Sequence, residues 1–236
     1  MLQIQHFSKS YDGKKKACDD VNLTIEAGDI FGFIGHNGAG KTTLLKSIAG
    51  ILDFEGGEIL VDGKSIKQEP LAAKSVMAYI PDNPDVYETL TGIQYLNFVA
   101  DIFGIATGDR RVAIEKYAAT FELADVLNHQ ISTYSHGMKQ KLVIMSALIH
   151  KPKIFILDEP FVGLDPKAAY LLKEIFREMC AAGSLIFFST HILEVAEKLC
   201  NKVAIIKLGK IVAVGNTLEI TKDQSLESLF LELIEK

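Results

Sequence analysis

The chain has 236 residues, enough for one α/β domain with a full hydrophobic core and room for an inserted subdomain. Its formal net charge of −5 lacks the basic excess typical of proteins that bind DNA or RNA, so no nucleic-acid partner is expected. The longest nearly uninterrupted apolar run, residues 142–149, is far shorter than the roughly 18 residues that a membrane-spanning helix needs. Three cysteines, Cys18, Cys180 and Cys200, lack the spacing of a metal site and indicate idle thiols in a reducing compartment.

The first eighty residues have the pattern of short strands around one helix. Tyr11-Asp12-Gly13 and three consecutive lysines separate the first two apolar segments, which favours an antiparallel pair. Pro81 ends the last of the segments. The pattern predicts strands at 2–7, 21–25, 30–34, 58–61 and 76–80, with a helix at 42–49 after the third strand.

Helical periodicity replaces this pattern between residue 82 and about residue 150, and alternating strands and helices then resume. The fold class predicted is α/β: a mostly parallel sheet with flanking helices, an N-terminal antiparallel β subdomain and an inserted helical subdomain. The core would comprise residues 1–81 and 152–236, and the helical subdomain about 82–151. The elements expected are helices at 94–103, 109–123, 138–149, 167–181, 192–199 and 225–234, and strands at 153–157, 185–188, 203–206 and 211–214.

A phosphate-binding motif follows the strand at 30–34. The segment Gly35-His36-Asn37-Gly38-Ala39-Gly40-Lys41-Thr42-Thr43 fits the pattern G-x-x-x-x-G-K-[ST]. Its glycines allow consecutive N–H groups to turn toward phosphates, and the following helix adds its positive N-terminus. Lys41 would reach the β- and γ-phosphates, Thr42 would bind Mg²⁺ and Thr43 would cap the loop. The motif predicts a P-loop that binds a nucleoside triphosphate.

Two carboxylates end the apolar strand Ile154–Leu157. A buried parallel strand delivers its last residues to the ligand-binding edge of the sheet. Asp158 would therefore hold Mg²⁺, through water, and Glu159 would act as the general base that activates the attacking water. The alternative, that the two acids merely cap a helix, is the less favoured one even alone and carries little weight beside a P-loop.

Further motifs make the whole chain resemble the ATP-binding subunit of an ATP-binding-cassette (ABC) transporter. Each is weak alone, since a histidine at a strand end is usually structural, but the ordered set is specific. The matching positions are Tyr11 for the aromatic residue that stacks on adenine, Tyr79-Ile80-Pro81-Asp82 for the Q-loop, Tyr134-Ser135-His136-Gly137-Met138-Lys139-Gln140 for the signature motif, Val162-Gly163-Leu164-Asp165 for the D-loop and His191 for the switch histidine.

The resemblance implies a P-loop ATPase that uses ATP and Mg²⁺. Ser135, His136, Gly137 and Met138 would contact the ATP of a second ABC subunit, in a head-to-tail homodimer or heterodimer that sandwiches two nucleotides. The partner implied is a separate membrane-spanning permease, which would hold the chain peripherally on the cytoplasmic, inner face of the cell membrane. The Ser-x-Gly-Met-x-Gln signature and the tail from Ser225 to Phe230 look most like the multidrug, antibiotic and lipid exporter branch.

Three positions depart from the family pattern. His36 stands where many members have proline, and because the loop binds through its backbone we expect little effect. The signature reads Ser-His-Gly in place of Ser-Gly-Gly. Asp82 replaces the usual glutamine with a shorter side chain, which puts its predicted catalytic contact to Mg²⁺ or the attacking water in doubt.

The stretch from Asp82 to about Leu96 is predicted to dock on the permease. Val86, Tyr87 and Leu90 are apolar where a solvated loop would favour polar residues, although they could instead pack on the subdomain's own helices. Two other functions compete with transport: a soluble ABC ATPase that acts on ribosomes or DNA, and a regulatory module that binds ATP without hydrolysis. The first usually carries two cassettes or a long coiled coil, and the second would be expected to have lost Lys41, Glu159 or His191.

Overall fold

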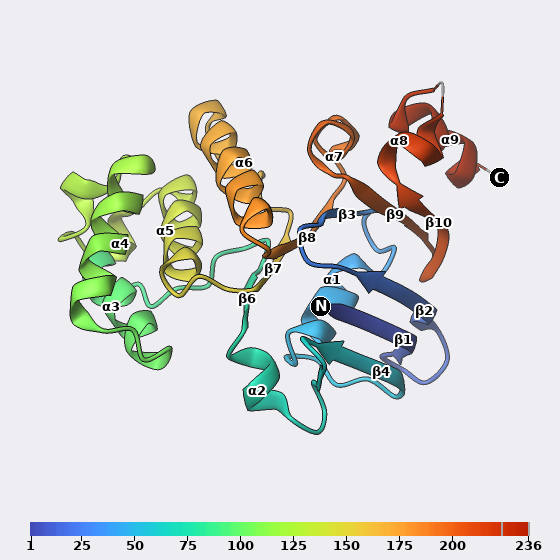
Figure 1. Cartoon of the computed structure of the whole chain (residues 1–236), viewed down its shortest axis with the longest axis horizontal. Coiled ribbons are helices and arrows are strands. Elements are labelled where there is room, and N and C mark those ends of the chain that lie inside the picture. The colour runs from blue at the N-terminus through green and yellow to red at the C-terminus, as the bar shows by residue number, and fades with distance from the viewer. Residues whose placement is uncertain (223, 236) are drawn as a thin grey trace. The chain divides into compact units, whose positions relative to one another are not determined.

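The computed structural model describes residues 1–222 and 224–235, and of Glu235 the backbone only. The chain forms two compact units, one made of residues 1–79, 153–160 and 176 onward, and the other of residues 80–152 and 161–175. The first unit contains both sheets and the second is helical (Figure 1). Helix α6 (Pro166–Ala181) begins in the second unit and ends in the first. No helix in the described ranges combines the length and apolarity needed to cross a bilayer.

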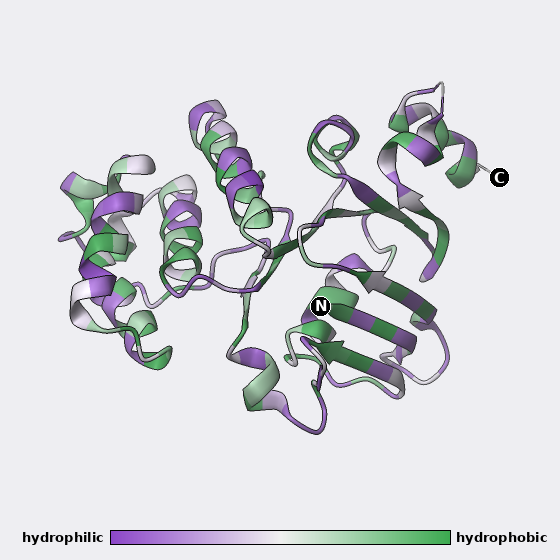
Figure 2. Ribbon diagram, viewed as in Figure 1, coloured by the Kyte–Doolittle hydropathy of each residue, from purple (hydrophilic) through white to green (hydrophobic). Residues whose placement is uncertain are grey.

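One sheet of the first unit is antiparallel, as predicted for its first two strands. Its order is β2-β1-β4-β5. Apolar and polar residues alternate along β1 and β2, and the colour bands of Figure 2 follow this alternation. The apolar face is buried, so this sheet has the one-sided pattern typical of antiparallel strands. The strands are β1 (Leu2–Ser10), β2 (Lys16–Ile25), β4 (Gly56–Val61) and β5 (Lys64–Ser65).

The second sheet of this unit has the order β10-β9-β3-β8-β7-β6. Strand β3 pairs in parallel with both β8 and β9, β7 pairs in parallel with β8, and β10 is antiparallel to β9. Every residue of β3, β7 and β8 is buried, which explains their nearly continuous apolar sequences. The strands are β3 (Ile30–Ile34), β6 (Met77–Ile80), β7 (Ile154–Asp158), β8 (Leu185–Thr190), β9 (Lys202–Lys207) and β10 (Lys210–Asn216).

The remaining helices of the first unit include two that the sequence pattern did not reveal. Both α2 (Pro70–Lys74) and α8 (Thr217–Thr221) have only five residues, too few for helical periodicity to be visible. The strand β5 was also missed, because two residues are too few to show an alternation of apolar and polar side chains. The other helices, α1 (Lys41–Ile48), α7 (Leu193–Leu199) and α9 (Leu226–Glu235), lie where helices were predicted.

The second unit consists of α3 (Gly92–Ile102), α4 (Thr107–Thr120), α5 (His136–Ile149) and two short 3₁₀ helices, η1 (Ala124–Val126) and η2 (Ile131–Thr133). A capping box begins α3: the Gln94 amide donates to Thr91 Oγ1 at 3.3 Å, and the Thr91 amide donates to Gln94 Oε1 at 2.9 Å. Helix α4 ends before the predicted Leu123, because Glu122 has a left-handed backbone with φ of +58°.

Candidate functional site

The predicted phosphate loop joins β3 to α1, the strand–loop–helix arrangement that its motif requires. Gly38 and Gly40 have φ of +79° and +111°, a region that other residues rarely adopt. A Cβ at Gly40 would lie 2.4 Å from the carbonyl oxygen of Ala17, and one at Gly35 would lie 2.7 Å from that of Ile206. The loop is therefore packed so closely against β2 and β9 that glycine is required at both positions.

Lys41 folds back over this loop from the first turn of α1. Its side chain is 6% exposed, and Nζ donates hydrogen bonds to the carbonyl oxygens of Gly35 at 2.6 Å and His36 at 3.3 Å. Burial lowers the pKa of Lys41, while the nearby carboxylates of Glu159 and Asp158 act against that shift. The ammonium group thus lies at the centre of the loop, where an anion would meet it.

The two predicted carboxylates lie at the end of β7. Glu159 Oε1 is 3.7 Å from Lys41 Nζ, and Glu159 Oε2 is 3.0 Å from His191 Nδ1. The backbone of Glu159 has φ of +49°, an uncommon conformation for a residue with a side chain. The carboxylate of Asp158 is almost fully buried at 1% exposed. The fold thus brings Lys41, Asp158, Glu159 and His191 together within the first unit.

Ser189 joins this group, although the sequence did not single it out. Its hydroxyl donates a hydrogen bond to Asp158 Oδ1 and accepts one from the Glu159 amide at 3.1 Å. The strand predicted at 185–188 continues in the structure to Thr190, which places Ser189 opposite Asp158 in the β7–β8 pairing. A small polar residue directly after a buried apolar strand, at the sheet edge that also carries two acids, is the signal that could have found it.

Tyr11 lies beside the phosphate loop and is 66% exposed. Its hydroxyl is 3.1 Å from Thr43 Oγ1. Asp12 shapes the loop that carries it, because Asp12 Oδ1 accepts the amides of Lys14 and Lys15 at 2.9 Å each, and these bonds lower the pKa of Asp12. The cavity under this loop has a volume of about 260 Å³ and is lined by Tyr11, Asp12, Lys15, Lys16, Ala17, Gly38, Leu208 and Gly209.

The predicted signature lies in the second unit, where Ser135 caps α5 by accepting the Met138 amide at 3.3 Å. It packs against the predicted D-loop. A Cβ at Gly137 would lie 2.8 Å from the carbonyl oxygen of Gly163, and a Cβ at Gly163 would lie 2.8 Å from His136 Cδ2. The extra imidazole of the Ser-His-Gly signature is therefore accommodated by a glycine.

Asp165 of the D-loop forms an ion pair with the helix that follows the signature. Its Oδ2 is 2.6 Å from Lys141 Nζ on α5, and its Oδ1 accepts the Ala168 amide at the start of α6 at 2.9 Å. The Lys141 ammonium and the Ala168 amide lower the pKa of Asp165. The carboxylate therefore stays ionised and links the D-loop to the signature helix.

Asp82 is exposed in the second unit, where its Oδ1 accepts the neighbouring Asn83 amide at 2.9 Å. This hydrogen bond orients the Asp82 carboxylate but is no evidence for a catalytic role. Its predicted reach to the metal stays a prediction.

Comparison with known proteins assigns the family. The ABC transporter family domain matches residues 18–162. ABC-type transporter ATP-binding protein EcsA of Bacillus subtilis (strain 168) is 34% identical over 99% of this chain and 96% of its own length. The linearmycin resistance ATP-binding protein LnrL of the same organism is 32% identical over 93% of this chain and 70% of its own length. A solved ATP-binding subunit of an ABC transporter superposes with a TM-score of 0.95 at 33% identity and covers 99% of both chains. The chain therefore belongs to the ABC transporter family and is an ATP-hydrolysing ATP-binding subunit.

Proposed function

We propose that the chain hydrolyses Mg-ATP in a head-to-tail dimer and so drives export through a separate membrane permease. The observation that carries this proposal is the convergence of three groups: Glu159 lies 3.7 Å from the Lys41 ammonium and 3.0 Å from the His191 imidazole. A phosphate-binding cation, a carboxylate base and a second proton-carrying group at one sheet edge are what hydrolysis of a terminal phosphate requires.

Nucleotide binding would begin at Lys41. Its ammonium now bonds to the neutral carbonyls of Gly35 and His36. Phosphate oxygens are stronger acceptors because they are charged, so a triphosphate in the loop would take over these bonds. The loop amides and the N-terminus of α1 would supply further donors. Adenine would stack on the exposed ring of Tyr11, above the cavity of about 260 Å³.

The residues beside the loop fit a magnesium ion. The hydroxyl of Thr42 in the first turn of α1 and the carboxylate of Asp158 at the end of β7 are hard oxygen ligands. Within the described ranges, no group of three or more His, Cys, Asp or Glu side chains could hold a metal by itself. This suits Mg²⁺, which takes few protein ligands beside phosphate and water. When bound, the ion would neutralise charge that develops on the phosphates.

Glu159 would accept the proton of the attacking water. Its left-handed backbone, with φ of +49°, and the contact between its Oε2 and His191 Nδ1 at 3.0 Å fix the direction of the carboxylate. His191 would hold this carboxylate and contact the γ-phosphate. Ser189 would position Asp158 and Glu159 together through its two hydrogen bonds.

The nucleotide-sandwich dimer is supported by the exposed start of α5. Ser135 and His136 are exposed there, and no acidic residue lies in the first turn of the helix. The positive end of α5 therefore suits the phosphates of an ATP held by the other subunit. Asp165 and Gly163 would transmit the state of this contact, because both are bonded to or packed on the signature helix.

The permease would dock on the second unit. Tyr87 is 61% exposed, Phe98 43% and Ile102 64%, and the rings of Tyr87 and Phe98 meet edge to face at 5.6 Å. A row of exposed apolar side chains favours a partner surface. The contact with Phe98 on α3 is also what the competing interpretation requires, namely packing on the subdomain's own helices, but the exposure of both rings favours docking. Because this family works with membrane permeases, the occupant we infer is a helical segment of that subunit.

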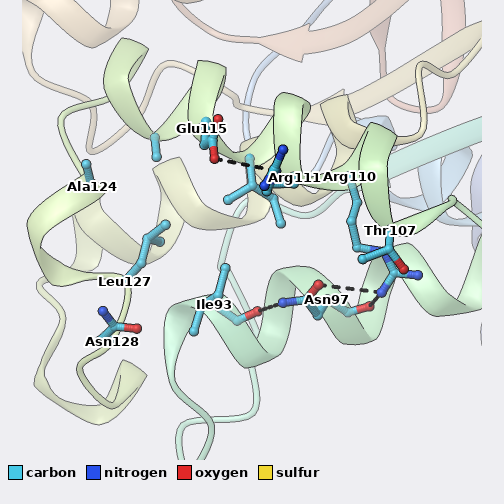
Figure 3. Close-up of a pocket in the computed structure, with 11 residues that line it drawn as sticks. Ile93, Asn97, Thr107, Arg110, Arg111, Glu115, Ala124, Leu127 and Asn128 are labelled. Atoms are coloured by element: carbon cyan, nitrogen blue, oxygen red, sulfur yellow. Dashed lines mark hydrogen bonds and ion pairs between the residues drawn. The ribbon is translucent and has the colours of Figure 1, made fainter.

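A groove in the same unit, lined in part by residues of α3 (Figure 3), extends the docking surface. It has a volume of about 500 Å³ and an apolar floor that includes Ile93 and Ile114. Arg110 closes one end: it bonds to the Ile105 carbonyl at 2.6 Å and to Asp101 at 2.6 Å, and it reaches toward Asn97 in Figure 3. A rigid polar end and an apolar floor would fix the register of a docked helix.

Docking could reach the signature through a short pairing. The Ser132 amide donates to the Glu88 carbonyl at 3.0 Å, and the Ile131 amide donates to the Leu90 carbonyl at 2.9 Å. The carboxylate of Glu88 also pairs with Lys139 of the signature helix. A movement of residues 88–90 would therefore move the start of α5. Asp82, at the beginning of the same loop, would contact Mg²⁺ or the attacking water once the two subunits close.

The export direction is supported by the relative whose name denotes linearmycin resistance. The chain would then lie at the cytoplasmic face of the membrane, held there by the permease. We keep residues 1–81 and 152–236 as the proposed ATPase core and about 82–151 as the helical subdomain, although residues 161–175 belong by their contacts to the helical unit. A soluble ABC ATPase acting on ribosomes or DNA would be preferred only if no permease bound.

The first experiment substitutes Glu159→Gln. The amide cannot accept the proton, whereas Lys41, Thr42 and Asp158 remain, so hydrolysis should fall at least about a hundredfold while ATP binding persists. Light scattering with Mg-ATP should then find a stable dimer. Turnover within about threefold of wild type would remove Glu159 from the role of base.

The second experiment tests docking with the double substitution Tyr87→Ser and Phe98→Ser. A membrane protein with about six spanning helices, sought among the products of the neighbouring genes, is co-expressed as the permease. Its co-purification is measured together with the ATPase rate of the isolated subunit. We expect lost co-purification with the rate unchanged. Val112→Ser is the control, because Val112 on α4 is similarly exposed at 63% but lies outside the docking surface as defined. An intact complex would contradict this docking surface and leave the ATPase proposal standing.

A further inference from the structure

The C-terminal helix α9 touches the phosphate loop. Phe230 of α9 is buried, at 6% exposed, and its ring meets the His36 imidazole at a centroid distance of 5.0 Å and an interplanar angle of 64°. His36 is the second residue of the loop, and its carbonyl accepts the Ala39 amide at 3.1 Å and Lys41 Nζ at 3.3 Å. Phe230 therefore packs against a residue whose backbone carbonyl holds the loop in shape.

Both ends of α9 are anchored in the first unit. At its start, Leu226 is fully buried and its amide donates to Glu197 Oε2 on α7 at 3.3 Å. Near its end, Lys207 at the end of β9 donates from Nζ to the Leu233 carbonyl at 3.2 Å. Helix α9 follows α8 at the C-terminal end of this unit (Figure 1). A helix held at both ends can support what packs against its middle.

The turn between β9 and β10 adds a second link to the same place. The Gly209 amide in this turn donates to the Ala39 carbonyl of the loop at 3.0 Å. Ile234 of α9 and Leu208 of the turn line one cavity of about 190 Å³ together with residues 36–39. The outer side of the first half of the phosphate loop thus rests on α9 and this turn.

We propose that α9 acts through the Phe230–His36 contact as a positioning element for ATP, so that the C-terminal helix sets nucleotide affinity. The first half of the loop contains Gly35 and Gly38, which cost the most conformational entropy to order. Residue 36 lies between them and gains its rigidity from the aromatic contact with Phe230. When α9 holds this ring in place, the loop carbonyls and amides are already arranged for phosphates. His36 and Phe230 are positioning residues, since the contact involves neither Glu159 nor His191.

The test is Phe230→Ala in the full chain, read by the Kd of a fluorescent ATP analogue and by the KM and kcat for Mg-ATP. An edge-to-face aromatic pair corresponds to a change of about three- to tenfold, so Kd and KM should rise by that factor while kcat stays within about twofold. Leu231→Ala is the matched control, because Leu231 lies next in the same helix and is 47% exposed. It should leave all three quantities unchanged.

A second pair of variants separates positioning from general destabilisation. Proline at position 36 would fix φ near −65° without help from Phe230, and no described hydrogen bond uses the His36 amide. In a His36→Pro background, Phe230→Ala should therefore have no further effect on Kd. If Phe230→Ala does not fold, Phe230→Leu keeps an apolar side chain without the ring and should raise Kd about threefold in a protein that still folds. An unchanged Kd in the folded Phe230 variant, or an equal rise with and without His36→Pro, would overturn the proposal.

Discussion

Ser189 gives a sharp test of the site, because the substitution Ser189→Ala removes a single hydroxyl from a fully buried position. The variant loses the hydrogen bond to the buried Asp158 carboxylate, and the Glu159 amide loses one acceptor. That amide keeps the Ser189 carbonyl as an acceptor at 3.2 Å, so the backbone arrangement should survive. A hydrogen bond to a charged group contributes about 1.5–3 kcal/mol. We therefore expect kcat/KM for Mg-ATP to fall about 30-fold, which corresponds to about 2 kcal/mol.

The assay is steady-state ATP hydrolysis at saturating and limiting Mg²⁺, with thermal unfolding measured on the same preparation. Ser146→Ala is the matched control, because Ser146 is equally small and buried, at 4% exposed, but its hydroxyl bonds to the Val143 carbonyl and to Tyr95 in the helical unit and not to a site carboxylate. The control should keep wild-type kinetics. If folded Ser189→Ala protein hydrolyses ATP within about threefold of wild type, the hydroxyl does not position the two carboxylates.

Three further predictions concern the environments of Lys41, Asp29 and the three cysteines. Lys41→Ala should weaken binding of a fluorescent ATP analogue at least about tenfold, because the charged donor at the centre of the loop is lost. Burial opposes ionisation of Asp29, yet hydrogen bonds from Asn201 and the Glu26 amide, with the Lys202 ammonium, lower its pKa. The ionised carboxylate therefore stabilises the fold above about pH 4, and this contribution is lost as the pH falls through the lowered pKa. Asp29→Asn should accordingly lower Tm by about 5 °C at pH 7 and by less at pH 3. Iodoacetamide at pH 8 should modify the thiols only after unfolding, because burial raises the pKa of Cys18 to about 12 and of Cys180 to about 11, and raises that of Cys200 too.

The sequence was most informative where one short segment determines its own structure. The strand, loop and helix around Lys41 could be predicted because the glycine spacing, the apolar run before it and the helical periodicity after it agree. The signature serine was correctly placed at the start of a helix, since Ser135 is a good N-cap residue. Roles of individual site residues stay predictions until the variants above are measured.

Contacts between distant segments could not be predicted in this way. Ser189 acquires its partners from the register of β7 against β8, and no local pattern reveals a register. We expected little effect from His36 because the loop binds phosphate through its backbone. That reasoning did not consider Phe230, which lies at the other end of the chain and meets the His36 ring only in the folded unit.

The most direct test of the composite ATP site is complementation between two inactive variants. Lys41→Ala removes the cation of the phosphate loop. Gly137→Asp blocks the signature, because a Cβ there would lie 2.8 Å from the Gly163 carbonyl and the added carboxylate would repel phosphate. In a head-to-tail homodimer, a mixed pair contains one intact site, built from the loop of one subunit and the signature of the other. Mixing equal amounts of the two variants should therefore restore about a quarter of the wild-type ATPase rate, whereas each alone stays inactive. A mixture as inactive as its components would contradict a site shared between two copies of this chain.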